Sequence, residues 1–102
     1  MQTTITARHC EVSEELRARA AAVMERMERY SPHALEAQVV FDVGADGQTA
    51  ELRLHVRGGQ ILVGLAAADD HRTALDRAEE KVKRQLEKAT AARRPRRSAA
   101  DS

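Results

Sequence analysis

The chain has 102 residues, 42% of them apolar, with one Phe, one Tyr and no Trp, which suits a single domain with a modest aliphatic core. Its single cysteine excludes an internal disulfide framework and fits a reducing compartment. No basic segment followed by an apolar run opens the chain, and no apolar run is long enough to cross a bilayer. We therefore expect a soluble, cytoplasmic protein.

The net charge of +1 conceals a strong polarity along the chain. Residues 1–71 hold 7 basic and 11 acidic residues, a local charge of −4, whereas residues 72–97 hold 10 basic and 4 acidic residues, a local charge of +6. Asp101 accounts for the remainder. Charge segregation of this kind bears on partners rather than on fold. It favours an anionic partner, either nucleic acid or an anionic membrane surface.

The first half of the chain predicts a strand, a helix and a second strand. Residues 2–8 alternate weakly between polar and apolar side chains, as a strand does. Ser13, followed by two glutamates, is typical of a helix N-terminus, and apolar residues at helical spacing continue to Tyr30. Ser31-Pro32 then ends the helix. Residues 37–43 alternate as the second strand.

The second half predicts two hairpins and a long helix. Asp46-Gly47 favours a tight turn, and residues 50–56 show the cleanest alternation in the chain. Gly58-Gly59 predicts the next turn, because glycine adopts a positive φ at no steric cost. Residues 60–67 form a fourth, mostly apolar strand. Asp69 or Asp70 is then expected to cap the last helix, which explains this carboxylate pair more simply than acid–base chemistry does.

These elements give the order β-α-β-β-β-α, an α+β fold. The strand–helix–strand start requires a parallel crossover, and the two hairpins continue an antiparallel meander. We therefore expect a four-stranded mixed sheet with two helices packed on one face, because each helix has a single apolar stripe. The folded domain is placed at residues 1–90. Residues 91–102 are expected to be a basic, disordered tail.

The last helix sorts its side chains into stripes when they are plotted at the helical angle of about 100° per residue. One stripe is apolar and contains Leu75, Ala78, Val82, Leu86 and Ala89. A second is basic and contains Arg77, Lys81, Arg84 and Lys88, and a third is acidic and contains Asp76, Glu80 and Glu87. An ordinary surface helix mixes its charges in i,i+4 pairs. A basic stripe that continues into Arg93-Arg94-Pro95-Arg96-Arg97 favours an extended anionic partner.

The first helix has a basic flank of its own, formed by Arg19, Arg26 and Arg29. If the helices lie side by side, this flank is expected to join the basic stripe of the last helix into one positive surface. Under that hypothesis, Arg26→Glu and Lys81→Glu each weaken the same binding event.

These features resemble the ribosome hibernation promoting factor and protein Y family, also described as sigma-54 modulation or S30EA proteins. The resemblance rests on the element order, on Arg26-Met-Glu-Arg29-Tyr30, and on the run Ala74-Leu-Asp-Arg-Ala-Glu-Glu-Lys81-Val-Lys-Arg84-Gln-Leu-Glu-Lys88. It covers roughly residues 2–90. It implies binding to the small ribosomal subunit between head and body, where the protein occludes the mRNA and tRNA sites of idle ribosomes. By motif, Arg26, Arg29, Lys81, Arg84 and Lys88 are the residues that would face ribosomal RNA.

Two features set this chain apart from the family pattern. Members often open the last helix with Asp-Met-Tyr, whereas this chain reads Asp70-His71-Arg72 and so replaces an aromatic residue with a cation. Long members carry a further dimerising domain, for which 102 residues leave no room. The chain therefore resembles the short form of the family.

The sequence thus predicts a ribosome-binding translation inhibitor, monomeric when free, whose partner is the small ribosomal subunit and its 16S rRNA. The predicted RNA-binding residues are Arg19, Arg26, Arg29, Arg77, Lys81, Arg84 and Lys88. No cofactor, metal, small-molecule substrate or membrane partner is expected. His9-Cys10 suggests a metal or nucleophile pair, but no second cysteine or suitably spaced histidine completes a site.

Four alternatives remain at this point. A generic double-stranded RNA or DNA-binding module uses a similar helix pair, and a basic stripe also occurs as a merely solvated face. An enzyme is disfavoured because the chain lacks a nucleophile–base pair and a glycine-rich cofactor loop. Membrane binding is disfavoured because the apolar stripe of the last helix is needed against the sheet, and large aromatic residues are missing.

Overall fold

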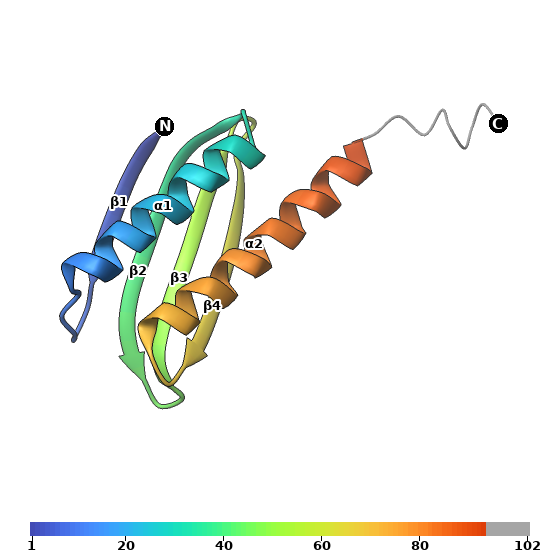
Figure 1. Cartoon of the computed structure of the whole chain (residues 1–102). Helices are drawn as coiled ribbons and strands as arrows, with labels where there is room; N and C mark the ends of the chain where they lie inside the picture. Colours follow the sequence, from blue (N-terminus) through green and yellow to red (C-terminus); the bar gives the residue numbers. More distant parts are fainter. Residues whose placement is uncertain (94–102) are drawn as a thin grey trace, which may run out of the picture.

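The structure is a computed structural model that describes the backbone of residues 1–93 and the side chains of residues 1–89. It confirms the predicted element order (Figure 1). The elements are β1 (Gln2–Ala7), α1 (Glu14–Tyr30), β2 (Ala34–Gly44), β3 (Gly47–Val56), β4 (Gln60–Ala68) and α2 (His71–Arg93). The rest of the predicted basic tail lies outside the described residues.

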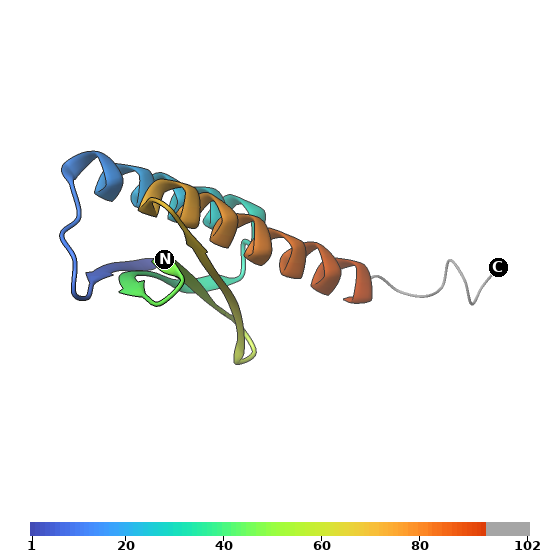
Figure 2. The same cartoon turned by 90° about the horizontal axis from the view of Figure 1, so that it is seen from below.

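The four strands form one mixed sheet in the order β1-β2-β3-β4. β1 pairs in parallel with β2, and both later pairs are antiparallel. The two helices lie side by side on one face of the sheet and leave the other face uncovered (Figure 2). The predicted four-stranded mixed sheet with two helices is therefore confirmed, and its free edges are β1 and β4.

The core lies between the helices and the covered face of the sheet. Alternate residues of β2 and β3 point into it, as their alternation predicts. The middle of the apolar stripe of α1 and the first part of the α2 stripe are fully buried, whereas Leu16, Leu86 and Ala89 are half-buried and Tyr30 is exposed. The largest fully buried side chains are Phe41, Met24, Met27, Leu52, Leu54 and Leu75.

Capping residues begin both helices. Ser13 Oγ accepts a hydrogen bond from the Leu16 backbone N–H at 3.1 Å, and Asp70 Oδ1 accepts one from the Thr73 N–H at 2.7 Å. Of the two aspartates considered, Asp70 is thus the cap of α2. These bonds satisfy backbone donors that a helix leaves unpaired at its start.

The first residue of α2 is buried, although the sequence placed it only near a helix end. His71 is 8% exposed, and its ring packs edge-on against Phe41 with 5.3 Å between the centroids. Its Nε2 lies 2.9 Å from the backbone oxygen of Asp42. Because a carbonyl oxygen can only accept, Nε2 carries the proton. His71 therefore fixes the start of α2 against β2.

Gly64 brings α2 unusually close to β4. A Cβ atom at this position would collide with the backbone carbonyl oxygen of Ala78 and would press on Val82. The absence of a side chain thus lets α2 rest on the strand backbone. At this separation the side chains on one flank of α2 reach the outer edge of β4.

Candidate nucleic-acid interface

The side chains along one flank of α2 bind the open backbone of β4. Arg77 donates to the Ala67 carbonyl oxygen at 3.1 Å, and Lys81 donates to that of Leu65 at 2.6 Å. Gln85 makes two bonds to Val63: its Nε2 donates to the carbonyl oxygen at 2.7 Å, and its Oε1 accepts from the N–H at 3.2 Å. Together these contacts pair successive outward-facing backbone groups of the edge strand.

The spacing of the two elements explains this arrangement. Four residues advance a helix by about 6 Å, and two residues advance a strand by about 6.6 Å. Because α2 runs opposite to β4, positions 77, 81 and 85 meet positions 67, 65 and 63 in turn. Covering an edge in this way protects it from pairing with other strands. Arg77 and Lys81 of the predicted basic stripe therefore also stabilise the fold.

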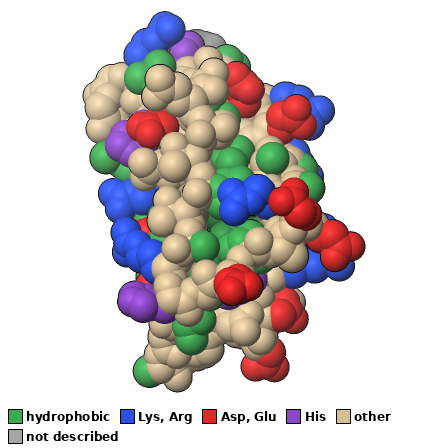
Figure 3. All heavy atoms as spheres, turned by 90° about the vertical axis from the view of Figure 1, so that its left-hand side faces the viewer, with side chains coloured by type: hydrophobic (Ala, Val, Ile, Leu, Met, Phe, Trp, Pro, Cys, Tyr) green, Lys and Arg blue, Asp and Glu red, His purple; other side chains and the backbone are tan. Residues whose placement is uncertain are grey.

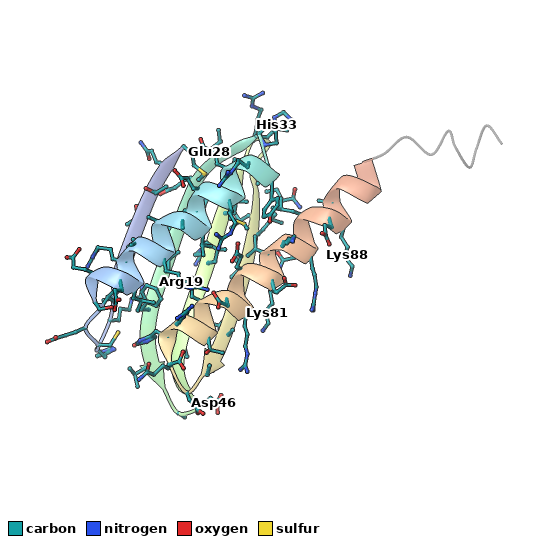
Figure 4. All side chains as sticks on the ribbon, viewed as in Figure 1. Arg19, Glu28, His33, Asp46, Lys81 and Lys88 are labelled. Atoms are coloured by element: carbon teal, nitrogen blue, oxygen red, sulfur yellow. The ribbon has the colours of Figure 1, made fainter. Side chains whose placement is uncertain are left out.

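The cation row, which we define as Arg77, Lys81, Arg84 and Lys88, is exposed along its whole length. Lys81 and Lys88 extend from the side of α2 that faces away from α1 (Figure 4). A groove of about 350 Å³ beside the row is lined by Ala66, Ala67, Arg77, Glu80, Lys81 and Arg84. The structure therefore brings these predicted residues together on one exposed surface.

Two of the three predicted arginines of α1, Arg19 and Arg26, contact the side of α2 that is turned away from the cation row. Arg19 donates from Nε and Nη2 to Asp76 Oδ1 and Oδ2, at 3.1 and 3.0 Å. Arg26 donates in the same way to Glu79 Oε2 and Oε1, at 2.7 and 3.0 Å. Arg19 lies between the two helices in Figure 4. Such two-pronged contacts are the strongest geometry for an arginine–carboxylate pair.

These ion pairs interrupt the single positive surface that the sequence suggested. The carboxylates of Asp76 and Glu79 stand between the α1 arginines and the cation row, so the two basic groups do not merge. The hydrogen bond to Glu79 is the main cause of a raised pKa for Arg26. The Glu79 side chain is 14% exposed and that of Arg26 is 38% exposed, so solvent reaches this pair from the arginine side. A contact of Arg19 or Arg26 with RNA stays a prediction.

Two cations lie at the end of α1: Arg29, which the sequence predicted, and Lys83 of α2, which lies outside the predicted basic stripe. Arg29 is exposed there. Lys83 of α2 lies with its Nζ 5.2 Å from the centre of the Tyr30 ring, in a cation–π contact that links the helices. Lys83 was overlooked because it faces α1 rather than the basic stripe. Its i,i+4 relation to Glu79 and Glu87 places it on their face of α2, but the sequence does not show that this face meets α1.

The remaining candidate sites have simpler explanations. His9 Nδ1 lies 3.0 Å from Asp42 Oδ1, and this hydrogen bond is the main cause of a lowered pKa for Asp42. Cys10 is a half-buried free thiol. Among the described residues, no group of three histidine, cysteine or carboxylate side chains is placed to hold a metal ion. No helix within residues 1–93 is long and apolar enough to cross a membrane.

Comparison with known proteins places this architecture among proteins of the ribosome. Residues 3–94 match the family model of the Sigma 54 modulation protein / S30EA ribosomal protein. The chain is 34% identical over 88 residues to the ribosome hibernation promoting factor of Escherichia coli (strain K12), covering 86% of this chain and 92% of that protein. It is 31% identical over 88 residues to the factor of the same name from Pseudomonas putida, covering 86% and 85%.

Solved structures show the same fold. A ribosomal subunit interface protein from Coxiella burnetii superposes with a TM-score of 0.78 at 18% identity, covering 89% of this chain and 99% of that one. The N-terminal domain of Thermus thermophilus Protein Y superposes with a TM-score of 0.74 at 24% identity, covering 86% and 98%. These likenesses concern the fold alone.

The family match also bears on chemistry. Hibernation factors are not enzymes, which agrees with the prediction of a non-enzymatic protein. The confirmed fold, the length of the match and the identity to the two curated relatives lead to one conclusion. This chain belongs to the Sigma 54 modulation protein / S30EA ribosomal protein family and is a homologue of ribosome hibernation promoting factors.

Proposed function

We propose that this protein inhibits translation by binding the small ribosomal subunit in its mRNA and tRNA cleft, with the cation row of α2 against 16S rRNA. The observation that carries the proposal is the row itself: Arg77, Lys81, Arg84 and Lys88 are exposed in a line on one rigid helix. The names of the relatives support a ribosomal partner.

The chemistry of the row suits a folded RNA. Lysine and arginine neutralise phosphates and release counterions, so affinity arises without sequence readout and falls as salt rises. Double-helical RNA hides its bases in a deep, narrow groove, so backbone and shape dominate its recognition. Occupying a cleft then needs a rigid body of suitable size and no catalytic step.

The sheet and core serve this function by holding α2 straight. Gly64 and the edge contacts of Lys81 and Gln85 fasten the helix along β4. The ion pairs of Arg19 and Arg26 fasten it to α1. The cations are therefore presented in a fixed line, which lowers the conformational entropy lost on binding.

The test is co-sedimentation of the purified protein with small ribosomal subunits, beside an equal mass of naked duplex RNA, at low and moderate salt. We expect saturable binding near one protein per subunit and much weaker binding to the duplex. Equal binding to both would contradict ribosome specificity and favour the generic double-stranded nucleic-acid module. Binding to neither would show that the row is a solvated face.

A further inference from the structure

The two edges of the sheet differ in whether side chains bind their outer backbone groups. Along β4, three side chains of α2 pair with the outward-facing backbone groups. Along β1, no side chain of residues 1–89 makes a hydrogen bond to the outer backbone, and the strand bonds on its inner side to β2. Open edges are templates for pairing with another strand. β1 is therefore available for strand addition.

A groove of about 430 Å³ adjoins this open edge on the helical side of the sheet. Figure 3, which views the molecule from the β1 side, shows hydrophobic side chains gathered at the middle of this face, with a basic side chain among them and acidic side chains mainly to one side. The groove is lined by Met1, Thr3, Ala18, Ala21, Ala22, Glu25 and Glu28. The alanines leave room beside α1 for a close neighbour, because helix axes approach to about 8–10 Å where side chains are small.

The flank of α1 next to this groove is self-complementary in charge. Arg17, Ala21, Met24 and Glu28 follow one another at i, i+4, i+7 and i+11, so they form one stripe. Met24 is buried, and the other three are exposed. The stripe thus has a cation towards the start of α1, an alanine at its centre and a carboxylate towards the end.

A two-fold axis through the middle of β1 brings the open strand edge and the charged flank of α1 into one interface. It places β1 antiparallel to β1 of a second copy and sets the two α1 helices side by side in opposite directions. The Met1 ammonium lies 3.4 Å from Glu28 Oε2, so the start of β1 adjoins the end of α1. This contact fixes where each α1 residue lies along the length of β1. Arg17 then faces Glu28 of the partner subunit, and symmetry repeats that contact.

We propose that the β1 edge and its groove bind a second copy of this chain, forming a two-fold dimer with a continuous sheet and an antiparallel α1 pair. The alanine-lined centres of the two α1 helices pack against each other, and two Arg17–Glu28 contacts select the antiparallel register. This inference does not rest on the proposed function, because the cation row lies at the β4 edge, across the sheet from β1. The prediction of a free monomer is the alternative that the next experiment decides.

Sedimentation equilibrium over a wide range of protein concentration tests the proposal. We expect a monomer–dimer equilibrium whose dissociation constant rises about tenfold or more in Arg17→Glu and again in Glu28→Arg, because each change creates two like-charge contacts per dimer. The double variant Arg17→Glu with Glu28→Arg should bring the constant back towards the wild-type value, short of it by the lost contact between Glu28 and the Met1 ammonium. Both positions are exposed, so circular dichroism should show unchanged helix content.

A matched control exchanges charges elsewhere on the surface. Arg72→Glu with Glu80→Arg makes the same changes at exposed positions of α2 and should leave the dimer constant unchanged. A chain that stays monomeric at every concentration would overturn the proposal. A dimer whose dissociation constant is unchanged in both single variants would also overturn it. So would a double variant whose constant stays as high as in the single variants.

Discussion

At the scale of single residues, two positions decide how α2 is seated. Gly64 removes the side chain that would hold the helix away from β4, and Asp70 supplies the oxygen that begins the helix. Both residues act through contacts within the domain and need no partner. Their substitution therefore tests the fold rather than the function.

Gly64→Ala should lower the free energy of unfolding by about 1–3 kcal/mol, because the new methyl group meets the rigid backbone of Ala78 and forces α2 outward. Urea denaturation measures this change. Gly44→Ala is the matched control, since a Cβ there meets Thr49 at an ordinary 4.0 Å. Equal stability of the two variants would contradict the close packing of α2 on β4.

Asp70 should make stability depend on pH in the acid range. The hydrogen bond from the Thr73 N–H lowers the pKa of Asp70 below its unfolded value. A lowered folded-state pKa gives stability that is present above the unfolded value of about 3.9 and is lost as pH falls through the folded value. The difference in unfolding free energy between wild type and Asp70→Asn should therefore be constant near neutral pH and shrink below about pH 4. Denaturant titrations across this range measure it, and a pH-independent difference would contradict the cap.

At the scale of elements, the order and type of every helix and strand could be predicted from the sequence. Alternation in residues 50–56, the Asp46-Gly47 turn and the Ser13 cap depend on neighbouring residues, so the sequence carries them directly. The pairing between helices could not be predicted in this way. Which residue of α1 meets which residue of α2 depends on the twist and spacing of the sheet beneath them.

The α1 arginines illustrate that limit. Their flank was correctly identified as a separate face of the helix, but its neighbour proved to be Asp76 and Glu79 rather than the cation row. Arg77 and Lys81 show the same effect at β4, where two residues chosen for RNA also bind backbone oxygens. Periodicity assigns residues to a face, and tertiary packing decides what the face meets.

A double-mutant cycle on Arg26→Gln and Glu79→Gln should reveal a coupling of about 1 kcal/mol, modest because the Arg26 side chain is 38% exposed. Each single variant should lower the unfolding free energy, and the double variant should lose less than their sum. Urea denaturation of the four proteins gives the coupling. Additive losses of unfolding free energy would contradict a stabilising ion pair between the helices.

Gln85→Ala should uncover part of the β4 edge, because it removes both bonds to Val63. We expect a loss of about 1–2 kcal/mol in unfolding free energy, with more self-association at high concentration. Denaturation and light scattering measure the two effects. Glu87→Ala, at an exposed position of the same helix, is the control and should change neither.

At the scale of the whole molecule, the charge polarity of the sequence becomes a spatial arrangement. The cation row lines the β4 side, and the open β1 edge with Glu25 and Glu28 lies across the sheet. A near-neutral chain is therefore strongly asymmetric. Such a field orients the protein as it approaches an anionic surface, with the cation row leading.

The central claim is that the cation row carries the binding to the small subunit. The sharpest variant is Arg84→Glu with Lys88→Glu, because it spares Arg77 and Lys81, which also cap β4. Its control is Arg8→Glu with Arg57→Glu, which makes the same charge change at exposed positions outside the helices. Both should retain the wild-type unfolding free energy to within about 0.5 kcal/mol.

The first measurement is the affinity of wild type and these two variants for purified small ribosomal subunits across a series of salt concentrations. We predict that the Arg84/Lys88 variant binds at least about a hundredfold more weakly and that its salt slope falls by about two, one for each lost phosphate contact. The control should lose much less. Equal losses in both variants, or wild-type affinity in the first, would contradict the assignment of the interface to the cation row.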